Sequence, residues 1–126
     1  MSDVVVTIPK DLWEDWIDEG DLPGDPPSGN RSHFWITGLP AIDVGERVYI
    51  VAHGRLRGYA PLVGIEQPCS LWRQRSCLLR DGGAVAVTIS EPIRGFQGWR
   101  YRWWDRDAEG PFRDWRTAEL IGGSRP

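Results

Sequence analysis

The stretch RGFQGWRYRWWDRD, residues 94–107, contains the side chains best suited to bind a flat or anionic ligand. It holds four Arg and five aromatic residues in fourteen positions. Aromatic faces stack on nucleobases with about 1–3 kcal/mol per base, and Arg adds cation–π and phosphate contacts. The same composition is typical of a packed strand, because buried aromatic rows are common. The sequence leaves both interpretations open.

Side chains alternate from Trp99 to Trp104, and on a strand alternate side chains lie on opposite faces. We expect one row to pack inward, because three exposed large aromatic side chains would favour aggregation. The other row joins two guanidinium groups to an indole, and we expect it to face a cleft or solvent. The inward row is Trp99, Tyr101 and Trp103; the outward row, which forms the candidate ligand-binding set together with Arg94, is Arg100, Arg102 and Trp104.

The sequence lacks the spacing of the common catalytic and metal sites. It contains no Gly-x-Ser-x-Gly elbow and no Gly-x-x-x-x-Gly-Lys-Ser/Thr loop. Cys69, Cys77, His33 and His53 do not form a zinc motif, so we expect free thiols, no metal and no cofactor. His33 is a candidate general base only if the protein is an enzyme, since a His in a strand more often makes a structural hydrogen bond.

Charge divides the chain into an acidic and a basic part. The formal net charge is −3, but residues 1–46 carry ten acids against Lys10 and Arg31, while residues 47–126 carry thirteen Arg against eight acids. The overall charge argues against a general nucleic-acid coat and allows a basic face on the second part. Mutual neutralisation of the two parts is the alternative.

Apolar segments are short throughout the sequence. No apolar run approaches the roughly 18 residues of a membrane span, and the acidic start lacks the pattern of a signal peptide. We therefore expect a soluble, cytoplasmic protein without membrane contact.

The N-terminal third predicts a strand, a helix and a loop. Val4 to Ile8 is β-branched and typical of a strand. From Pro9 to Gly20 the apolar residues share one face, which predicts a short amphipathic helix. Residues 20–32 hold three Pro and three Gly and predict a long loop that is either disordered or part of a site. Residues 33–39, HFWITGL, predict the next strand.

Residues 47–66 give the clearest structural pattern. They predict an antiparallel hairpin that turns at residues 53–55, with Val48 and Ile50 buried. Asp81-Gly82-Gly83 predicts a second hairpin between residues 76–80 and 84–90, after a short helix or turn that ends near Arg75. The tail from about residue 120 is expected to fray.

These elements predict a single domain, residues 1–126, that is mainly β with short helices (α+β) and folds as a small, partly closed β-barrel. The first hairpin resembles that of the PUA-like superfamily, which includes ASCH and EVE domains, over about residues 4–105. Nine residues carry the resemblance: Val44, Gly45, Glu46, Val48, Tyr49 and Ile50 on the outgoing arm, and Gly58, Ala60 and Val63 on the return.

The resemblance implies a β-barrel with an N-terminal helix that binds RNA, a modified base or a nucleotide in a cleft. It indicates Asn30, Ser32 and Trp35 as ligand contacts, because GNRSHFW lies roughly where EVE-type domains contact their ligands. The Gly-Lys-x-x-Glu-x-Arg motif of many ASCH domains is absent, since Lys10 is the only Lys. This absence argues against the nuclease-like chemistry proposed for those domains.

We therefore predict a non-catalytic module that binds nucleic acid, a modified base or a nucleotide-like ligand in a cleft lined by Trp and Arg. Single-stranded RNA or DNA is the expected partner. The first alternative is a small ASCH-like hydrolase or ribonuclease with His33 as base. The second is a protein-interaction module in which exposed Trp side chains are binding hot spots. The sequence indicates no oligomeric state.

Overall fold

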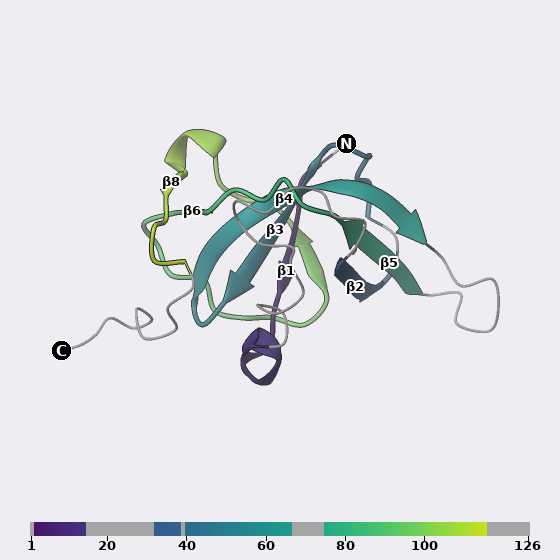
Figure 1. The fold of residues 1–126 in the computed structure, drawn as a ribbon, viewed down its shortest axis with the longest axis horizontal. Coiled ribbons are helices and arrows are strands. Elements are labelled where there is room, and N and C mark those ends of the chain that lie inside the picture. Colours follow the sequence, from purple (N-terminus) through teal and green to yellow (C-terminus); the bar gives the residue numbers. More distant parts are fainter. Residues whose placement is uncertain (1, 15–31, 39, 67–74, 116–126) are drawn as a thin grey trace.

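The chain folds around a curved β-sheet. The computed structural model describes residues 2–14, 32–38, 40–66 and 75–115. Its elements are β1 (Val4–Thr7), the 3-10 helix η1 (Lys10–Leu12), β2 (Ser32–Thr37), β3 (Arg47–Ala52), β4 (Arg55–Glu66), β5 (Arg75–Arg80), β6 (Val87–Thr88), β7 (Trp99–Tyr101), the 3-10 helix η2 (Arg106–Ala108) and β8 (Gly110–Pro111). Six strands form one sheet in the order β2-β5-β4-β3-β1-β7, and β6 pairs with β8. The large sheet curls into a nearly closed barrel (Figure 1), so the predicted mainly β class is confirmed.

The predicted first hairpin is confirmed. β3 and β4 pair antiparallel, from Arg47 opposite Pro61 to Ala52 opposite Arg55. The connecting residues His53 and Gly54 have φ of 48° and 75°, and positive φ at both central residues is the geometry of a type I′ hairpin turn. Val48 and Ile50 are buried on the inner face of the sheet, as the alternation predicted.

The central strands β1 and β3 are covered on both faces. The inner core contains Val4, Val6, Val48 and Ile50, joined by residues of β2, β4 and β5. A second core, which we call the outer core, lies on the opposite face of the same strands, because the chain after β5 folds back over that face. Its buried residues are Val5, Tyr49, Val51, Leu56, Ile89, Ile93 and Trp104.

Gly58 allows the chain after β5 to cross β4 at close range. Tyr59 and Val85 exchange two backbone hydrogen bonds there, of 3.0 and 2.8 Å. Gly58 has φ of 148°, and a Cβ atom at this position would lie 2.5 Å from the carbonyl oxygen of Val85. A glycine is therefore required for this approach.

The predicted second hairpin, with arms at residues 76–80 and 84–90, is wrong. β5 pairs with β2 on one side and with β4 on the other, so neither edge of β5 is open to residues 84–90. These residues instead form the bridge to Tyr59 and the short β6, which pairs with β8.

Side chains connect the two edge strands of the barrel. The Trp99 indole N–H on β7 donates to the carbonyl oxygen of Thr37 at the end of β2, at 2.8 Å. The Tyr101 hydroxyl accepts from the amide of Ala41 at 2.9 Å. We call these two bonds the seam, since no backbone ladder between β2 and β7 closes the described sheet.

The predicted N-terminal amphipathic helix is not shown by the described residues, which include only its first positions up to residue 14. η1 covers Lys10–Leu12, Trp13 is buried in the inner core, and Leu12 is exposed rather than buried. Residues 15–20 of the predicted helix, the predicted loop at 20–32 up to residue 31, the predicted helix or turn before Arg75 and the tail from about residue 120 lie outside the described residues. Within the described residues, no helix is long and apolar enough to cross a membrane.

Candidate ligand-binding surface

The alternating pattern of residues 99–104 ends where β7 ends. β7 pairs with β1 only from Trp99 to Tyr101. The next amide, of Arg102, still donates to the carbonyl oxygen of Asp3 at 3.1 Å, and the chain then leaves the sheet for η2. Trp103 and Trp104 therefore lie in a loop, where the two-residue period of a strand no longer determines which way a side chain points.

The predicted inward and outward rows are wrong at three positions, and the end of β7 explains two of them, Trp103 and Trp104, since Tyr101 is still paired with Val4. Tyr101 and Trp103, expected inside, are 42% and 45% exposed, while Trp104, expected outside, is only 8% exposed. Trp99 is half-buried against the inner core and Arg100 is exposed, as predicted.

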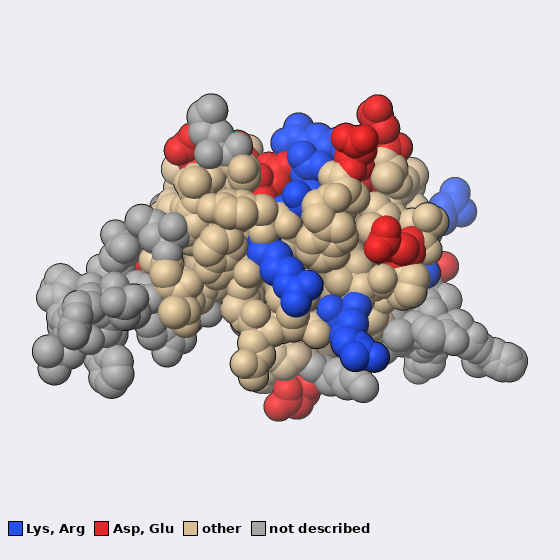
Figure 2. All heavy atoms as spheres, turned by 180° about the vertical axis from the view of Figure 1, so that it is seen from behind, with Lys and Arg blue, Asp and Glu red and all other residues tan. Residues whose placement is uncertain are grey.

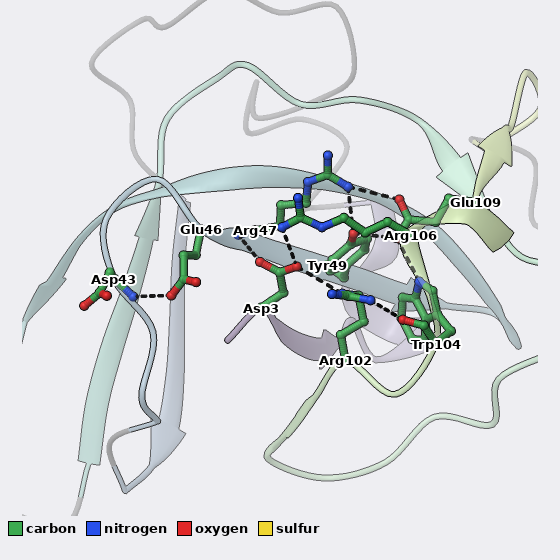
Figure 3. A network of polar contacts seen from close by, with 9 residues as sticks. All are labelled: Asp3, Asp43, Glu46, Arg47, Tyr49, Arg102, Trp104, Arg106 and Glu109. Carbon is green, nitrogen blue, oxygen red and sulfur yellow. Dashed lines mark hydrogen bonds and ion pairs between the residues drawn. The ribbon is translucent and has the colours of Figure 1, made fainter. Parts of the chain in front are cut away.

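Trp104 belongs to the outer core and joins a covered polar network (Figure 3). Its indole N–H donates to the Glu109 carboxylate at 2.8 Å, and the Tyr49 hydroxyl donates to the same oxygen at 2.5 Å. Arg47 forms an ion pair with the other oxygen at 3.1 Å, and the Glu109 side chain is 6% exposed. Burial and then the hydrogen bond to Glu109 raise the pKa of Tyr49 above its ordinary range. Tyr49 therefore stays protonated and acts as a donor.

The Arg102 side chain also makes hydrogen bonds within the protein. Its Nε donates to the buried Asp3 carboxylate at 3.0 Å, and its Nη1 donates to the carbonyl oxygen of Trp104. Arg106 and the amide of Arg47 also donate to Asp3, each at 2.9 Å. Burial raises the pKa of Asp3, but the bonds from the Arg47 amide, Arg106 and Arg102 outweigh it and hold the pKa below its usual value.

Three side chains of the segment remain together at the surface: Phe96, Arg100 and Trp103. The guanidinium carbon of Arg100 lies 4.4 Å from the centre of the Phe96 ring. The rings of Phe96 and Trp103 are 6.4 Å apart and packed edge to face. Arg94 is exposed in the same loop, two residues before Phe96. We call Phe96, Arg100 and Trp103 the aromatic–arginine surface.

The sequence prediction therefore missed Trp103 and Phe96. Both lie outside a regular strand, so alternation carried no information on them. The available signal was Gly95 and Gly98, which flank Phe96 and indicate a loop before β7. A loop at this point makes a partly exposed Phe96 a reasonable expectation, and the structure shows it half-buried against the core on the outer face of the sheet.

The remaining predicted site residues lie on or near β2. In its register with β5, Ser32 is opposite Arg80, His33 is opposite Leu79, and Trp35 is opposite Cys77. The side chains of these three β2 residues, and the whole of Asn30, lie outside what the structure describes.

Basic side chains are unevenly distributed on the molecule. On the face seen in Figure 2, they form a broken diagonal band across a mostly uncharged surface, and acidic side chains lie along the upper edge, at the right and at the bottom. In the described part of the chain, no three His, Cys, Asp or Glu side chains group as metal ligands would. Cys77 is a buried free thiol, and burial raises its pKa.

Comparison with known proteins gives one remote likeness. No protein-family model and no curated protein matches the chain. The fold is similar to the crystal structure of a mutant of the ZmASCH protein from Zymomonas mobilis, with 13% sequence identity, coverage of 82% of this chain and 91% of that chain, and a TM-score of 0.49. At such a low identity and score this likeness carries nothing about ligand or activity.

Proposed function

We propose that the protein is a non-catalytic module that binds single-stranded nucleic acid or a nucleotide-like ligand at the aromatic–arginine surface. The observation that carries the proposal is the exposed Trp103 indole, 45% accessible, beside an Arg100 guanidinium stacked on Phe96. An exposed indole can stack on any of the bases, so this contact requires no particular nucleotide sequence. When a guanidinium lies against a ring face, the N–H groups at its edge remain available to bind phosphate.

Arg94 extends the proposed surface, since it is exposed in the loop that leads to Phe96. Trp104 and Arg102 contribute indirectly in this proposal. Trp104 is packed beneath Trp103, with ring centres 5.0 Å apart, and Arg102 holds the carbonyl of Trp104. These two residues fix the loop from which Trp103 projects.

A binding titration tests the proposal. Fluorescence anisotropy with short labelled single-stranded RNA and DNA compares the unmodified protein with Trp103→Ala, Arg100→Ala and Arg113→Ala. Trp103→Ala should weaken binding by about 5- to 150-fold, which corresponds to about 1–3 kcal/mol for one stacked base. The loss for Arg100→Ala should shrink as salt rises, because phosphate contacts release counterions.

Arg113→Ala is the matched control, because it removes the same charge from an exposed Arg outside the surface. If Arg100→Ala and Arg113→Ala lower the affinity equally, the effect of Arg100 comes from the net charge of the protein and not from a specific contact. If no oligonucleotide or nucleotide binds, the ligand class is wrong and the exposed Trp103 is better explained as a contact for another protein. The His33 side chain, on which the alternative hydrolase depends, lies outside the described residues.

A further inference from the structure

A polar hollow of about 180 Å³ lies beside the start of β1. Its lining residues come from three places in the chain, namely the N-terminal segment, the turn before β3 and the segment after β7. They are Ser2, Asp3, Glu46, Arg102 and Arg106. At roughly 30 Å³ of liquid volume per water, this space suits one small polar molecule. It is built from residues other than the aromatic–arginine surface.

Asp3 at the base of the hollow is already saturated. One of its oxygens accepts from the Arg47 amide, and the other accepts from both Arg102 and Arg106. The single carboxylate charge is thus faced by two guanidinium groups. The base of the hollow has an excess of positive charge, which favours an anionic group on a ligand.

The rim offers one free donor group and one free acceptor. Arg106 uses only Nη2 on Asp3, and its Nε and Nη1 bond to nothing among the described residues; its side chain is 50% exposed. Glu46 accepts from the Asp43 amide with Oε1 at 2.8 Å, which leaves Oε2 without a partner in the described part of the chain. Figure 3 shows Asp3 between Glu46 on one side and Arg102 and Arg106 on the other.

We propose that this hollow binds a small zwitterion, a molecule such as a free α-amino acid that carries a carboxylate and an ammonium group close together. The carboxylate is held by Arg106, and the ammonium group is held by Glu46. A simple anion of the same size would face the Glu46 carboxylate, and a simple cation would face the two guanidinium groups. Only a ligand with both charges satisfies the free donor and the free acceptor together.

Ligand-dependent stability of the 126-residue chain, with no tag residues added before Met1, tests the proposal. Glycine, serine and glutamate are compared with acetate, phosphate and methylammonium at equal ionic strength. At least one amino acid should raise the Tm, since a ligand that binds only the folded state stabilises it. Arg106→Gln and Glu46→Gln should each raise the Kd of that amino acid by about tenfold or more, as expected for loss of a charge-assisted bond.

Asp107→Asn is the control, since Asp107 is exposed next to Arg106 and does not line the hollow. A second measurement does not depend on the variants: the amino acid should shift the backbone NMR signals of Ser2, Glu46 and Arg106 in the unmodified protein. The proposal is overturned if acetate or phosphate binds as tightly as the amino acids and Glu46→Gln strengthens that binding. It is overturned equally if none of the three amino acids shifts the Tm or these signals.

Discussion

The hairpin of β3 and β4 and the segment from Trp99 to Trp104 both alternate in sequence, but only the hairpin keeps its alternation in the structure. β3 is paired along its whole length, with β4 on one side and β1 on the other. β7 is paired to β1 over three residues and then ends. Alternation predicts a side chain's direction only while a backbone ladder continues. Beyond Tyr101, local polar contacts determine the direction instead.

The sharpest test of this comparison is the pair Trp103 and Trp104, neighbours of identical type. Trp104→Ala should lower the free energy of unfolding by about 3–5 kcal/mol, because it empties a site in the outer core and leaves Glu109 without one of its donors. Trp103→Ala should cost less than about 1 kcal/mol, since the side chain is half accessible. Urea denaturation of both variants measures the difference. Equal losses would mean that Trp103 is also a core residue.

A second test of the comparison concerns Glu109, because its carboxylate connects the loop after β7 to β3. Glu109→Ala should destabilise the fold by about 2–3 kcal/mol, since the buried Tyr49 hydroxyl and Trp104 N–H lose their acceptor. Glu109→Gln keeps one acceptor oxygen and should cost less. If Glu109→Ala leaves the Tm unchanged, the network does not hold the loop, and another contact must place Trp104 in the core.

The sequence was sufficient for β1 and for the first hairpin, but not for the partners of β5 and of residues 84–90. β-branched runs predicted β1, and alternation around a two-residue turn predicted β3 and β4. Asp3 shows why the segment after β7 could not be predicted in the same way. Its partners Arg102 and Arg106 lie about a hundred positions away in the chain, and no local pattern encodes a contact of that separation.

The buried Arg57 shows a further limit of sequence patterns. Arg is almost never fully buried without partners, so a pattern-based prediction places it at the surface. In the structure Arg57 is 1% exposed and donates to the carbonyl oxygens of Ala52 and Trp115. Burial lowers its pKa to about 10, and Arg55 adds to the effect. The Ala52 carbonyl belongs to the same hairpin, but the Trp115 carbonyl reaches Arg57 only once the chain after β8 is folded against the hairpin.

Asp3 gives a third, smaller test through pH. Because its pKa is lower in the folded protein than the ordinary value of 3.8, its ionised form contributes stability that is fully present above that value. This contribution is lost as the pH falls through the folded pKa. Asp3→Asn should therefore cost about 1–2 kcal/mol at pH 7, a figure kept small because Arg106 is half exposed and screened.

Urea denaturation of the unmodified protein and of Asp3→Asn at a series of pH values measures this effect. The gap between the two proteins should be constant near neutral pH and should close as the pH falls below about 4. A gap that persists at low pH would mean that the Asp3 bonds do not depend on its charge. The loop after β7 would then be held chiefly by Glu109.

The smallest expected effect concerns the seam, where the side chains of β7 contact the edge of β2. Tyr101→Phe removes the acceptor of the Ala41 amide and should cost about 0.5–1 kcal/mol, because the bond is exposed and water can replace the hydroxyl. Trp99→Phe should cost somewhat more, since it also loses packing against the inner core. Native-state hydrogen exchange is the better measurement for the first variant: the Ala41 amide should exchange faster, while amides in the middle of β3 keep their rates. If the β3 amides also exchange faster, the seam supports the whole barrel. The short β7 would then stabilise the sheet as strongly as the fully paired hairpin does.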